Sequence, residues 1–561
     1  MKKVKFLAMF LVLALTVSMF AGCSSTGSSK DQNQSATSSA QGSGNAGSTD
    51  SALPAGHADY MSYAIWNQSF DLKPFASSAG GRGQLLQMIW PRLCVLTSYG
   101  GKLEDAEMWL AKKITKVDDV TYDVELYDNI IDSKGYQIKA EDVKWSYEMA
   151  TTLGEQTEVG GVLGGIEILD DYNLRFTLNS PGEGKAEVML GFHRMTICSK
   201  EWYENATDEE RSVDAATAAP YRIKEYIPGS MVVLEAVENY WQKDESLRGV
   251  AGQQNVKTVY CPVITEKAVR AISLQNGEID WTTIDVSSLD MFFQNGQALD
   301  GWNVDALGGE RARVLFLNMD ESSTSPVATN VKLRQAVLHA LDRDALRRAA
   351  GFSEYTAWVC YDIGTTKMAG YNEAWQNDWY EYDPDLAKQL LAEAGYPNGV
   401  TLRLMAATSQ NAGMIAYLQE SLEQIGIHVE LLSYDQALFN TYKYDSSVWD
   451  IIVDQKGGYS LIDDWYNLFN PGGYTNGGVN FCKDQQLYDL INTVMLDASQ
   501  ENIDAVHERL KDLALGTGLY CEARINVSQG GITKTVWNNY NEPLMNAWEF
   551  SPDFKSNYPL R

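Results

Sequence analysis

Alternating apolar and polar residues mark several short segments as half-buried strands. The segments 120–127 (VTYDVELY) and 173–179 (NLRFTLN) alternate in this way, and 231–241 begins with the same pattern. A period of two residues is typical of a strand with one face on a core and the other in water. Apolar residues spaced three and four apart instead predict helices at 266–280 and 331–352.

A helix followed by glycine and an apolar strand appears twice between residues 382 and 434. In the first unit Asp383 is placed to cap the helix, Pro384 to open it and Gly395 to end it. This order of elements is typical of a βαβ layer with a buried parallel sheet. The remaining segments of the two units are a strand at 400–408, a helix at 415–426 and a strand at 427–434.

The first 56 residues differ in composition from the rest of the chain. Residues 1–22 have a basic start, an apolar run and a final small pair, the parts of a secretory signal peptide. Cys23 follows directly, as in the lipobox of bacterial lipoproteins, and Ser, Gly, Gln and Thr dominate the following residues. We therefore predict a lipidated cysteine and a disordered tether over 23–56. The expected location is extracytoplasmic, with a lipid anchor on the outer face of the bacterial cell membrane; the alternatives are ordinary secretion and an uncleaved anchor.

Length and charge restrict the function classes. Residues 57–561 are enough for two or three domains, and 45% of the chain is hydrophobic. The formal net charge of −29 argues against nucleic acid, which requires a basic face. Six cysteines besides Cys23 form no CxxC motif, the five histidines do not cluster, and no calcium loop is present, so we expect no metal and no cofactor. Whether the six cysteines pair stays open.

Five blocks in a fixed order resemble one protein family. They are GYQIKAEDVKWSYEMA (135–150), ATAAPYRIKEYIPGSMVVLEAVENYW (216–241), AVRAISLQNGEID (268–280), LFLNMDESSTSPVATNVKLRQAVLHALDRD (315–344) and YDPDLAKQLLAEAG (382–395). Together they resemble the extracytoplasmic solute-binding proteins of ABC transporters in the oligopeptide/dipeptide/nickel class, family 5. Each block alone would pass for ordinary scaffold, and the blocks do not identify a ligand.

The resemblance implies an α/β fold of the periplasmic-binding-protein type, with two lobes, an extra subdomain in lobe one and a hinged ligand cleft. Lobe one is expected to comprise 57–95, 218–305 and a C-terminal return over 520–561. The subdomain is expected at 96–217 and lobe two at 306–519.

In peptide binders of this family an acidic residue, in a loop of lobe two, pairs with the amino terminus of the ligand. The matching stretch here is 449–473, where the expected position falls near Gly457. Asp454, Asp463 and Asp464 are close enough to replace it, although a loop aspartate is more often a turn former or a cap.

Aromatic and polar residues complete the candidate ligand-binding site. Tyr459 and Trp465 offer ring faces that stack on peptide side chains or sugars, with core packing as the alternative for Trp465. The first loops of lobe one are expected to contribute Trp66, Asn67, Trp90 and Arg92, of which Arg92 is suited to pair with a carboxylate.

The predicted function is a receptor, not an enzyme. It would capture a small solute, with a peptide as the family default, and deliver it as a monomer to an ABC permease in the membrane. An oligosaccharide or another organic solute is the alternative. An extracellular hydrolase is the rival class, because Asp170-Asp171 and Asp463-Asp464 are paired carboxylates. Neither a GxSxG nor an HExxH motif is present, which argues against that class.

Overall fold

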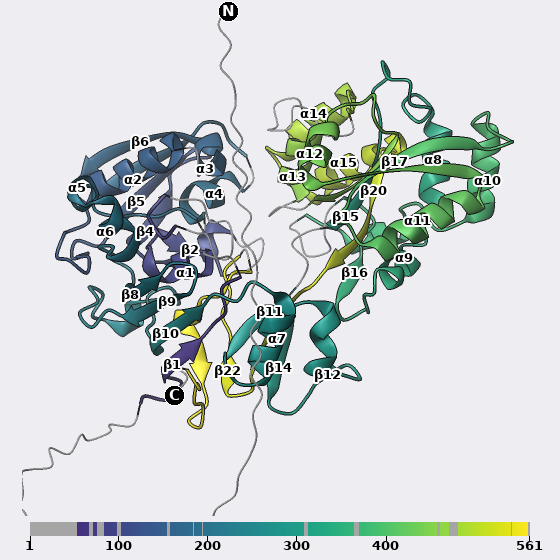
Figure 1. Cartoon of the computed structure of the whole chain (residues 1–561). Helices are drawn as coiled ribbons and strands as arrows, with labels where there is room; N and C mark the ends of the chain where they lie inside the picture. Colours follow the sequence, from purple (N-terminus) through teal and green to yellow (C-terminus); the bar gives the residue numbers. More distant parts are fainter. Residues whose placement is uncertain are drawn as a thin grey trace, which may run out of the picture. The chain divides into compact units, whose positions relative to one another are not determined.

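The computed structural model describes residues 53–66, 71–75, 83–97, 102–153, 157–182, 184–192, 194–307, 312–363, 370–456, 461–470, 481–539 and 541–558. The signal segment, Cys23 and the predicted tether up to residue 52 therefore lie outside the described residues. The buried apolar residues of 312–521 form one core, here called the core of lobe two. Two other cores are built from 58–292 and 525–550 and belong to lobe one (Figure 1).

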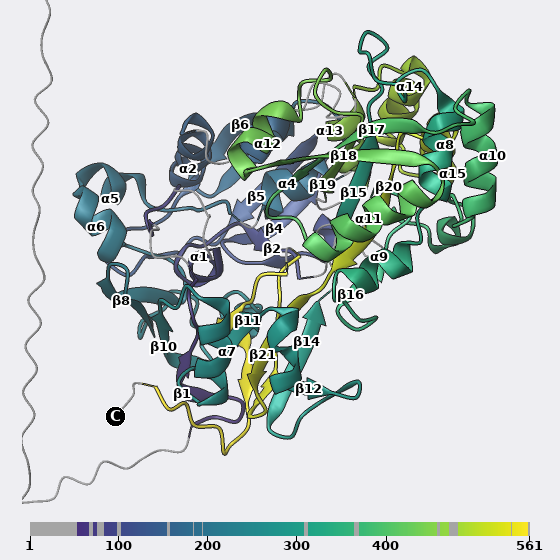
Figure 2. The ribbon, with the colours of Figure 1, turned by 45° about the vertical axis from the view of Figure 1, so that its right-hand side comes forward.

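Lobe one contains two sheets that combine distant parts of the chain. The first has the order β1-β10-β9-β8, with β1 parallel to β10. The second has the order β11-β21-β14, and its middle strand comes from the C-terminal return. Helix α7 packs beside β11 (Figure 2). The bounds are β1 (Ala58–Ser62), β8 (Tyr221–Ile227), β9 (Met231–Ala236), β10 (Val256–Pro262), α7 (Lys267–Gln275), β11 (Trp281–Ile284), β14 (Trp302–Leu307) and β21 (Arg524–Gln529).

A separate four-stranded antiparallel sheet has the order β4-β5-β7-β6 and is built from residues between 111 and 178. Its strands β5 and β7 confirm the predicted strands at 120–127 and 173–179, and their burial alternates as expected. The bounds are β4 (Ala111–Lys116), β5 (Thr121–Leu126), α2 (Ala140–Thr152), β6 (Leu163–Asp170) and β7 (Asn173–Leu178).

Lobe two is built on a six-stranded sheet of order β16-β20-β15-β19-β17-β18. β17 is parallel to both β18 and β19, which confirms the predicted parallel unit. β18 is an edge strand, however, so it is only partly buried, contrary to the expected continuous burial. The bounds are β15 (Ala312–Leu317), β16 (Ala357–Val359), β17 (Val400–Ala407), β18 (Ile427–Tyr434), β19 (Ile451–Lys456) and β20 (Gly516–Glu522).

The helices of lobe two largely follow the sequence pattern. Helix α10 (Pro384–Glu393) begins at the predicted cap, since the Asp383 carboxylate accepts from two backbone N–H groups. The prediction of a single helix at 331–352 is wrong. The segment forms two helices, α8 (Val331–His339) and α9 (Arg343–Ala349), because the Asp342 carboxylate accepts from the Ala345 N–H and caps the start of the second helix.

The other helices are α1 (Gly83–Ile89), α3 (Thr157–Val162), α4 (Lys185–Gly191), α5 (Lys200–Asn205), α6 (Asp208–Val213), α11 (Ala412–Gln424), α12 (Gln436–Tyr442), α13 (Leu461–Phe469), α14 (Gln485–Val494) and α15 (Gln500–Leu513). The remaining short strands are β2 (Cys94–Val95), β3 (Glu107–Met108), β12 (Phe293–Gln294), β13 (Gln297–Ala298), β22 (Ile532–Lys534) and β23 (Glu549–Phe550). Among the described residues no helix has the length and apolar character to cross a membrane.

The chain returns from lobe two to lobe one between β20 and β21. β20 continues to Glu522, three residues beyond the expected boundary at 519. Ala523 lies between the two strands, and its N–H donates to the Thr356 carbonyl at 2.8 Å. A disulfide joins Cys360 to Cys521 at this end of β20, and four other described cysteines are buried thiols.

Candidate functional site

The carboxyl ends of the parallel strands of lobe two lie at one edge of the sheet. β17 and β18 end as the pair Ala407 and Tyr434, and β19, which runs parallel to β17, ends at Lys456. Lys456 pairs with Ala312, the first residue of β15, so this edge is also where the chain enters lobe two. In open α/β sheets, ligands bind outside the carboxyl ends of the strands. This edge is therefore the part of lobe two best placed to meet a ligand.

Charged side chains gather at this edge beside the crossing. The Arg313 Nε donates to the Glu522 carboxylate at 2.8 Å, and its Nη1 donates to Gln410 Oε1 at 3.0 Å. Glu522 is the last residue before the crossing, and Gln410 follows β17. The pair joins strand β15 to β20 at the point where any rotation between the lobes would have to act.

Asp454, the first candidate for an amine anchor, is already held by two lysines. Its side chain is 11% exposed, and Oδ2 lies 3.5 Å from Lys443 Nζ and 3.3 Å from Lys456 Nζ. Two ammonium groups beside one carboxylate leave a positive local charge. The structure therefore corrects the expectation of a free anionic anchor at Asp454, because a ligand amine would meet excess positive charge there.

Three of the other lobe-two candidates lie on a helix and not in the expected loop. Residues 461–469 form helix α13 instead of a loop, and the aromatic candidate Trp465 is fully buried against Trp375 with ring centroids 6.1 Å apart. Its ring faces the core, so of the two alternatives for Trp465 the structure shows core packing and not a ring face offered to a ligand. Asp463 and Asp464 lie in the first turn of this helix, where Asp464 is half-buried. Tyr459 lies outside the described residues, as does the side chain of Asp463.

In lobe one, the chain after β1 continues in extended form and stays hydrogen-bonded to the β10 segment as far as Ile65. Tyr63 forms a parallel β-bridge with Trp281. Trp66, three residues further along the chain, is half-buried. The Arg270 guanidinium lies 6.0 Å from the centre of the Trp66 ring, and the Tyr63 and Trp66 rings are 6.4 Å apart. Trp66 thus lies beyond the carboxyl end of β1 and stays a candidate, whereas Asn67 falls outside the described residues.

Trp90 and Arg92 are structural residues, contrary to the expectation. Trp90 is 1% exposed, and its indole N–H donates to the Leu72 carbonyl at 3.0 Å. Arg92 is 2% exposed, donates to Gln87 Oε1 and lies over the Trp109 ring at 5.5 Å. Both side chains are enclosed by the core of lobe one, so neither presents a surface to a ligand.

The C-terminal return supplies charged residues that the sequence did not indicate. Gln87 Nε2 donates to the Glu542 carboxylate at 2.9 Å. Burial raises the pKa of Glu542, and the nearby guanidiniums of Arg194 and Arg524 only partly oppose it. Arg524 is the first residue after the crossing, and its Nη1 donates to the Asn541 carbonyl at 2.7 Å. Because their partners come from other parts of the chain, no local pattern could have identified them.

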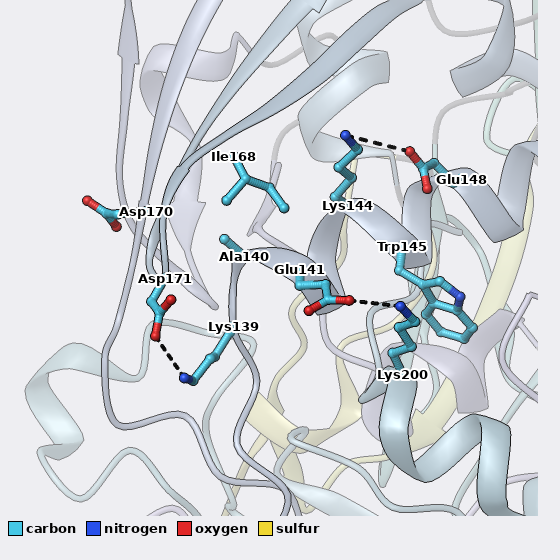
Figure 3. Close-up of a pocket in the computed structure, with 10 residues that line it drawn as sticks. All are labelled: Lys139, Ala140, Glu141, Lys144, Trp145, Glu148, Ile168, Asp170, Asp171 and Lys200. Atoms are coloured by element: carbon cyan, nitrogen blue, oxygen red, sulfur yellow. Dashed lines mark hydrogen bonds and ion pairs between the residues drawn. The ribbon is translucent and has the colours of Figure 1, made fainter.

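A cavity of about 470 Å³ lies between α2, the β6–β7 turn and the start of α5 (Figure 3). Its three lysines are each paired with a carboxylate: Lys139 with Asp171 at 2.8 Å, Lys200 with Glu141 at 2.8 Å and Lys144 with Glu148 at 3.9 Å.

The acidic pair at this cavity does not have the arrangement of a hydrolase. Asp170 accepts from the Tyr172 N–H and from Asn173 within the turn, while Asp171 is held by Lys139. The two carboxylates thus have separate structural partners. Across the described residues, no group of three or more His, Cys, Asp or Glu side chains is arranged to hold a metal ion.

Comparisons with known proteins agree on one family. Residues 105–478 match the family model described as bacterial extracellular solute-binding proteins, family 5 Middle. The glutathione-binding protein GsiB of Pectobacterium atrosepticum is 24% identical over 330 residues, which are 57% of this chain and 59% of that protein. The match thus spans about three fifths of that relative's length.

Solved structures extend the likeness of fold to most of the chain. HbpA2 from Haemophilus parasuis superimposes with a TM-score of 0.74 at 18% identity, over 88% of this chain and 100% of that one. The periplasmic binding protein DppA from Helicobacter pylori, in complex with the peptide STSA, gives a TM-score of 0.65 at 20% identity, over 88% and 98%. These likenesses show that the chain has the α/β fold of periplasmic binding proteins.

Proposed function

The chain belongs to the bacterial extracellular solute-binding proteins of family 5, and we propose that it captures a small peptide and delivers it to an ABC importer. The solute would occupy the space between the carboxyl edges of the two lobes, and closure would occur by rotation at the crossing. The protein would act as a monomeric receptor without chemistry of its own.

The observation that carries this proposal is the convergence of strand ends on the crossing. In lobe two, Lys456 and Glu522 end their strands at the edge where β15 begins. In lobe one, Arg524 opens β21 opposite Leu307, the last residue of β14. The strand ends of both sheets thus meet at the short connection between β20 and β21. This arrangement suits a hinge at the connection and a ligand bound beside it.

A peptide is favoured over a sugar by two considerations. GsiB is described as binding glutathione, and the DppA structure contains a tetrapeptide. In addition, Trp465, the ring that most suggested sugar stacking, is buried in the core of lobe two. An oligosaccharide or another organic solute of the same size remains the alternative and is included in the test below.

The location proposed for the receptor follows from the family and from the N-terminal sequence. Family 5 proteins are extracytoplasmic, and the signal-like residues 1–22 with Cys23 support a lipid anchor on the outer face of the cell membrane. An anchored receptor would stay near its permease while the tether leaves the lobes free to move.

The test is identification of the solute by mass spectrometry of the purified chain, followed by thermal-shift measurements with peptides of two to five residues and with oligosaccharides. A bound peptide at a hundredfold excess over its Kd should stabilise the folded state by about 2.7 kcal/mol. Trp66→Ala should reduce this stabilisation, whereas Trp145→Ala, another half-buried tryptophan but at the cavity beside α2, should not. Stabilisation by sugars alone, or by neither class, would overturn the proposal.

A further inference from the structure

Three buried hydrogen-bond donors in lobe one have no acceptor within the described part of the chain. They are the Tyr63 hydroxyl, the Trp281 indole N–H and the Arg270 Nε–H. The three residues are 0%, 2% and 4% exposed, respectively. A buried donor without a partner costs free energy, so native proteins rarely leave one, and three in one neighbourhood require an explanation.

The three residues are neighbours. The rings of Tyr63 and Trp281 lie 4.5 Å apart, and the backbones of the two residues form a parallel bridge. Arg270 and Tyr63 both lie beside Trp66: the Arg270 guanidinium is 6.0 Å and the Tyr63 ring 6.4 Å from the centre of the Trp66 ring. The Arg270 Nη1 donates to the carbonyls of Ile264 and Thr265, at 2.9 and 2.8 Å, which fixes the guanidinium beside the half-buried Trp66 ring.

Two guanidiniums act on Tyr63. Those of Arg270 and Arg524 oppose the effects of burial, Cys261 and Glu542 on its pKa. Burial raises the pKa of Tyr63 well above its ordinary value, so the phenol keeps its proton and remains a donor at neutral pH. The Trp281 indole and the guanidinium can only donate.

Donors of this kind are satisfied by a group that only accepts. A carboxylate offers two oxygens with about four lone-pair sites and a charge that suits a guanidinium. We propose that Tyr63, Arg270 and Trp281 form a carboxylate-binding subsite in lobe one that receives an acidic group of the solute. The inference rests on the proposed receptor function. It assigns the recognition of an acid to lobe one, beside Trp66 and the crossing.

The subsite can be tested directly with formate as the probe, because formate is the smallest carboxylate. The full chain labelled with ¹⁵N-tryptophan has fifteen indole groups, and Trp281→Phe identifies the signal of Trp281. Replacing sodium chloride by sodium formate at constant ionic strength should move that signal saturably, as a hydrogen bond forms to the indole N–H. Tyr63→Phe, which removes one donor to a charged acceptor, should weaken formate binding about tenfold.

Trp449 provides the matched control. It is also fully buried, and its indole N–H has no partner among the described residues, but it precedes β19 at the opposite edge of the lobe-two sheet. Its signal should stay in place during the formate titration, and Trp449→Phe should leave formate binding unchanged. Equal movement of both signals, or no saturable movement of the Trp281 signal up to molar formate, would overturn the inference.

The failure of the subsite is distinguishable from the failure of the receptor function. If a solute found by mass spectrometry binds Tyr63→Phe and the original protein equally well, the subsite is wrong and the receptor function stands. If formate titrates Trp281 but no peptide or other organic solute binds, the subsite stands and the receptor function falls.

Discussion

Two buried arginines, one in each lobe, have similar environments but different hydrogen bonding. Arg270 in lobe one and Arg343 in lobe two are 4% and 5% exposed and lie over the rings of Trp66 and Tyr361. Burial lowers the pKa of both, to about 10 for Arg343. All three nitrogens of the Arg343 guanidinium donate, to Thr517, Gly518 and Tyr380, whereas the Nε of Arg270 has no acceptor in the described chain.

The difference separates scaffold from site. A guanidinium whose three nitrogens all donate within the protein gains little from a ligand and mainly holds the chain segments around it together. One with a donor left over is stabilised by any acceptor that arrives, so its free energy changes on binding. The comparison therefore predicts that Arg343 matters more for folding and Arg270 more for binding.

The largest expected effect is on stability at Arg343. Arg343→Met should lower the free energy of unfolding by about 3–5 kcal/mol, because the Tyr380 carbonyl loses its donor in the core and Thr517 and Gly518 each lose a hydrogen bond from the guanidinium. Arg270→Met should cost about 1–3 kcal/mol, since only the carbonyls of Ile264 and Thr265 lose a partner. Urea unfolding of both variants measures the difference, and an equal or larger loss for Arg270→Met would contradict the distinction.

The disulfide beside the Arg343 contacts should have the next largest effect. Cys360–Cys521 closes a loop of 161 residues and joins β20 to the segment after β16. Removing it in Cys360→Ala/Cys521→Ala should cost about 2–5 kcal/mol. Thermal unfolding with and without a reductant checks this: the original protein should lose stability on reduction, and the double variant should not respond. A variant as stable as the oxidised protein would show that the lobe-two scaffold does not depend on the bond.

Two tyrosines test the same contrast between a donor with a partner and one without, because replacing each by phenylalanine removes only its hydroxyl group. Tyr147, fully buried in the subdomain, donates its hydroxyl to the Met189 carbonyl at 2.9 Å, so Tyr147→Phe should cost about 1 kcal/mol. Tyr63→Phe should leave the free energy of unfolding unchanged or raise it slightly, because the hydroxyl that it removes has no partner in the described chain. Denaturant unfolding of the two variants gives the comparison. A loss at Tyr63 equal to that at Tyr147 would show that the Tyr63 hydroxyl is already satisfied.

Local features of the fold were predictable, and contacts between distant segments were not. The α10 cap at Asp383 and the parallel strands β17 and β18 depend on residues within one short segment, so their patterns are visible in the sequence. Asp280, in contrast, is fully buried and accepts from Ser62, Gln529 and Ser556, which are more than 200 residues away. No spacing along the chain carries that information.

The candidate site was less predictable, for two different reasons. The segment LIDDWYNLF (461–469) has apolar residues at helical spacing, so helix α13 and the burial of Trp465 could have been read from the sequence. The resemblance to a loop of the family outweighed that pattern. The donors of the proposed subsite had no such signal, because Tyr63, Arg270 and Trp281 come together only when Tyr63, just after β1, bridges to Trp281 of β11 and α7 packs beside β11.

The smallest effect on the free energy of unfolding is expected at a third, more exposed arginine. Arg509 is partly exposed and donates to the Asp484 carboxylate at 3.0 and 2.6 Å, which lowers the pKa of Asp484 from its ordinary value of 3.8. A carboxyl with a depressed folded-state pKa stabilises the protein above its unfolded pKa and loses that contribution as the pH falls through the folded value. Arg509→Met should therefore cost about 0.2–1 kcal/mol at neutral pH and progressively less below about pH 4.

Unfolding free energies of Arg509→Met and the original protein across this acidic range measure the effect, with Lys257→Met, which removes an exposed partner of Asp59, as the control for an ordinary surface pair. A difference that stays constant as Asp484 protonates would mean that Arg509 stabilises by packing instead of charge. In that case exposure would not explain why the three arginines contribute differently to the free energy of unfolding. The difference between Arg270 and Arg343 would then have to come from their hydrogen bonds alone.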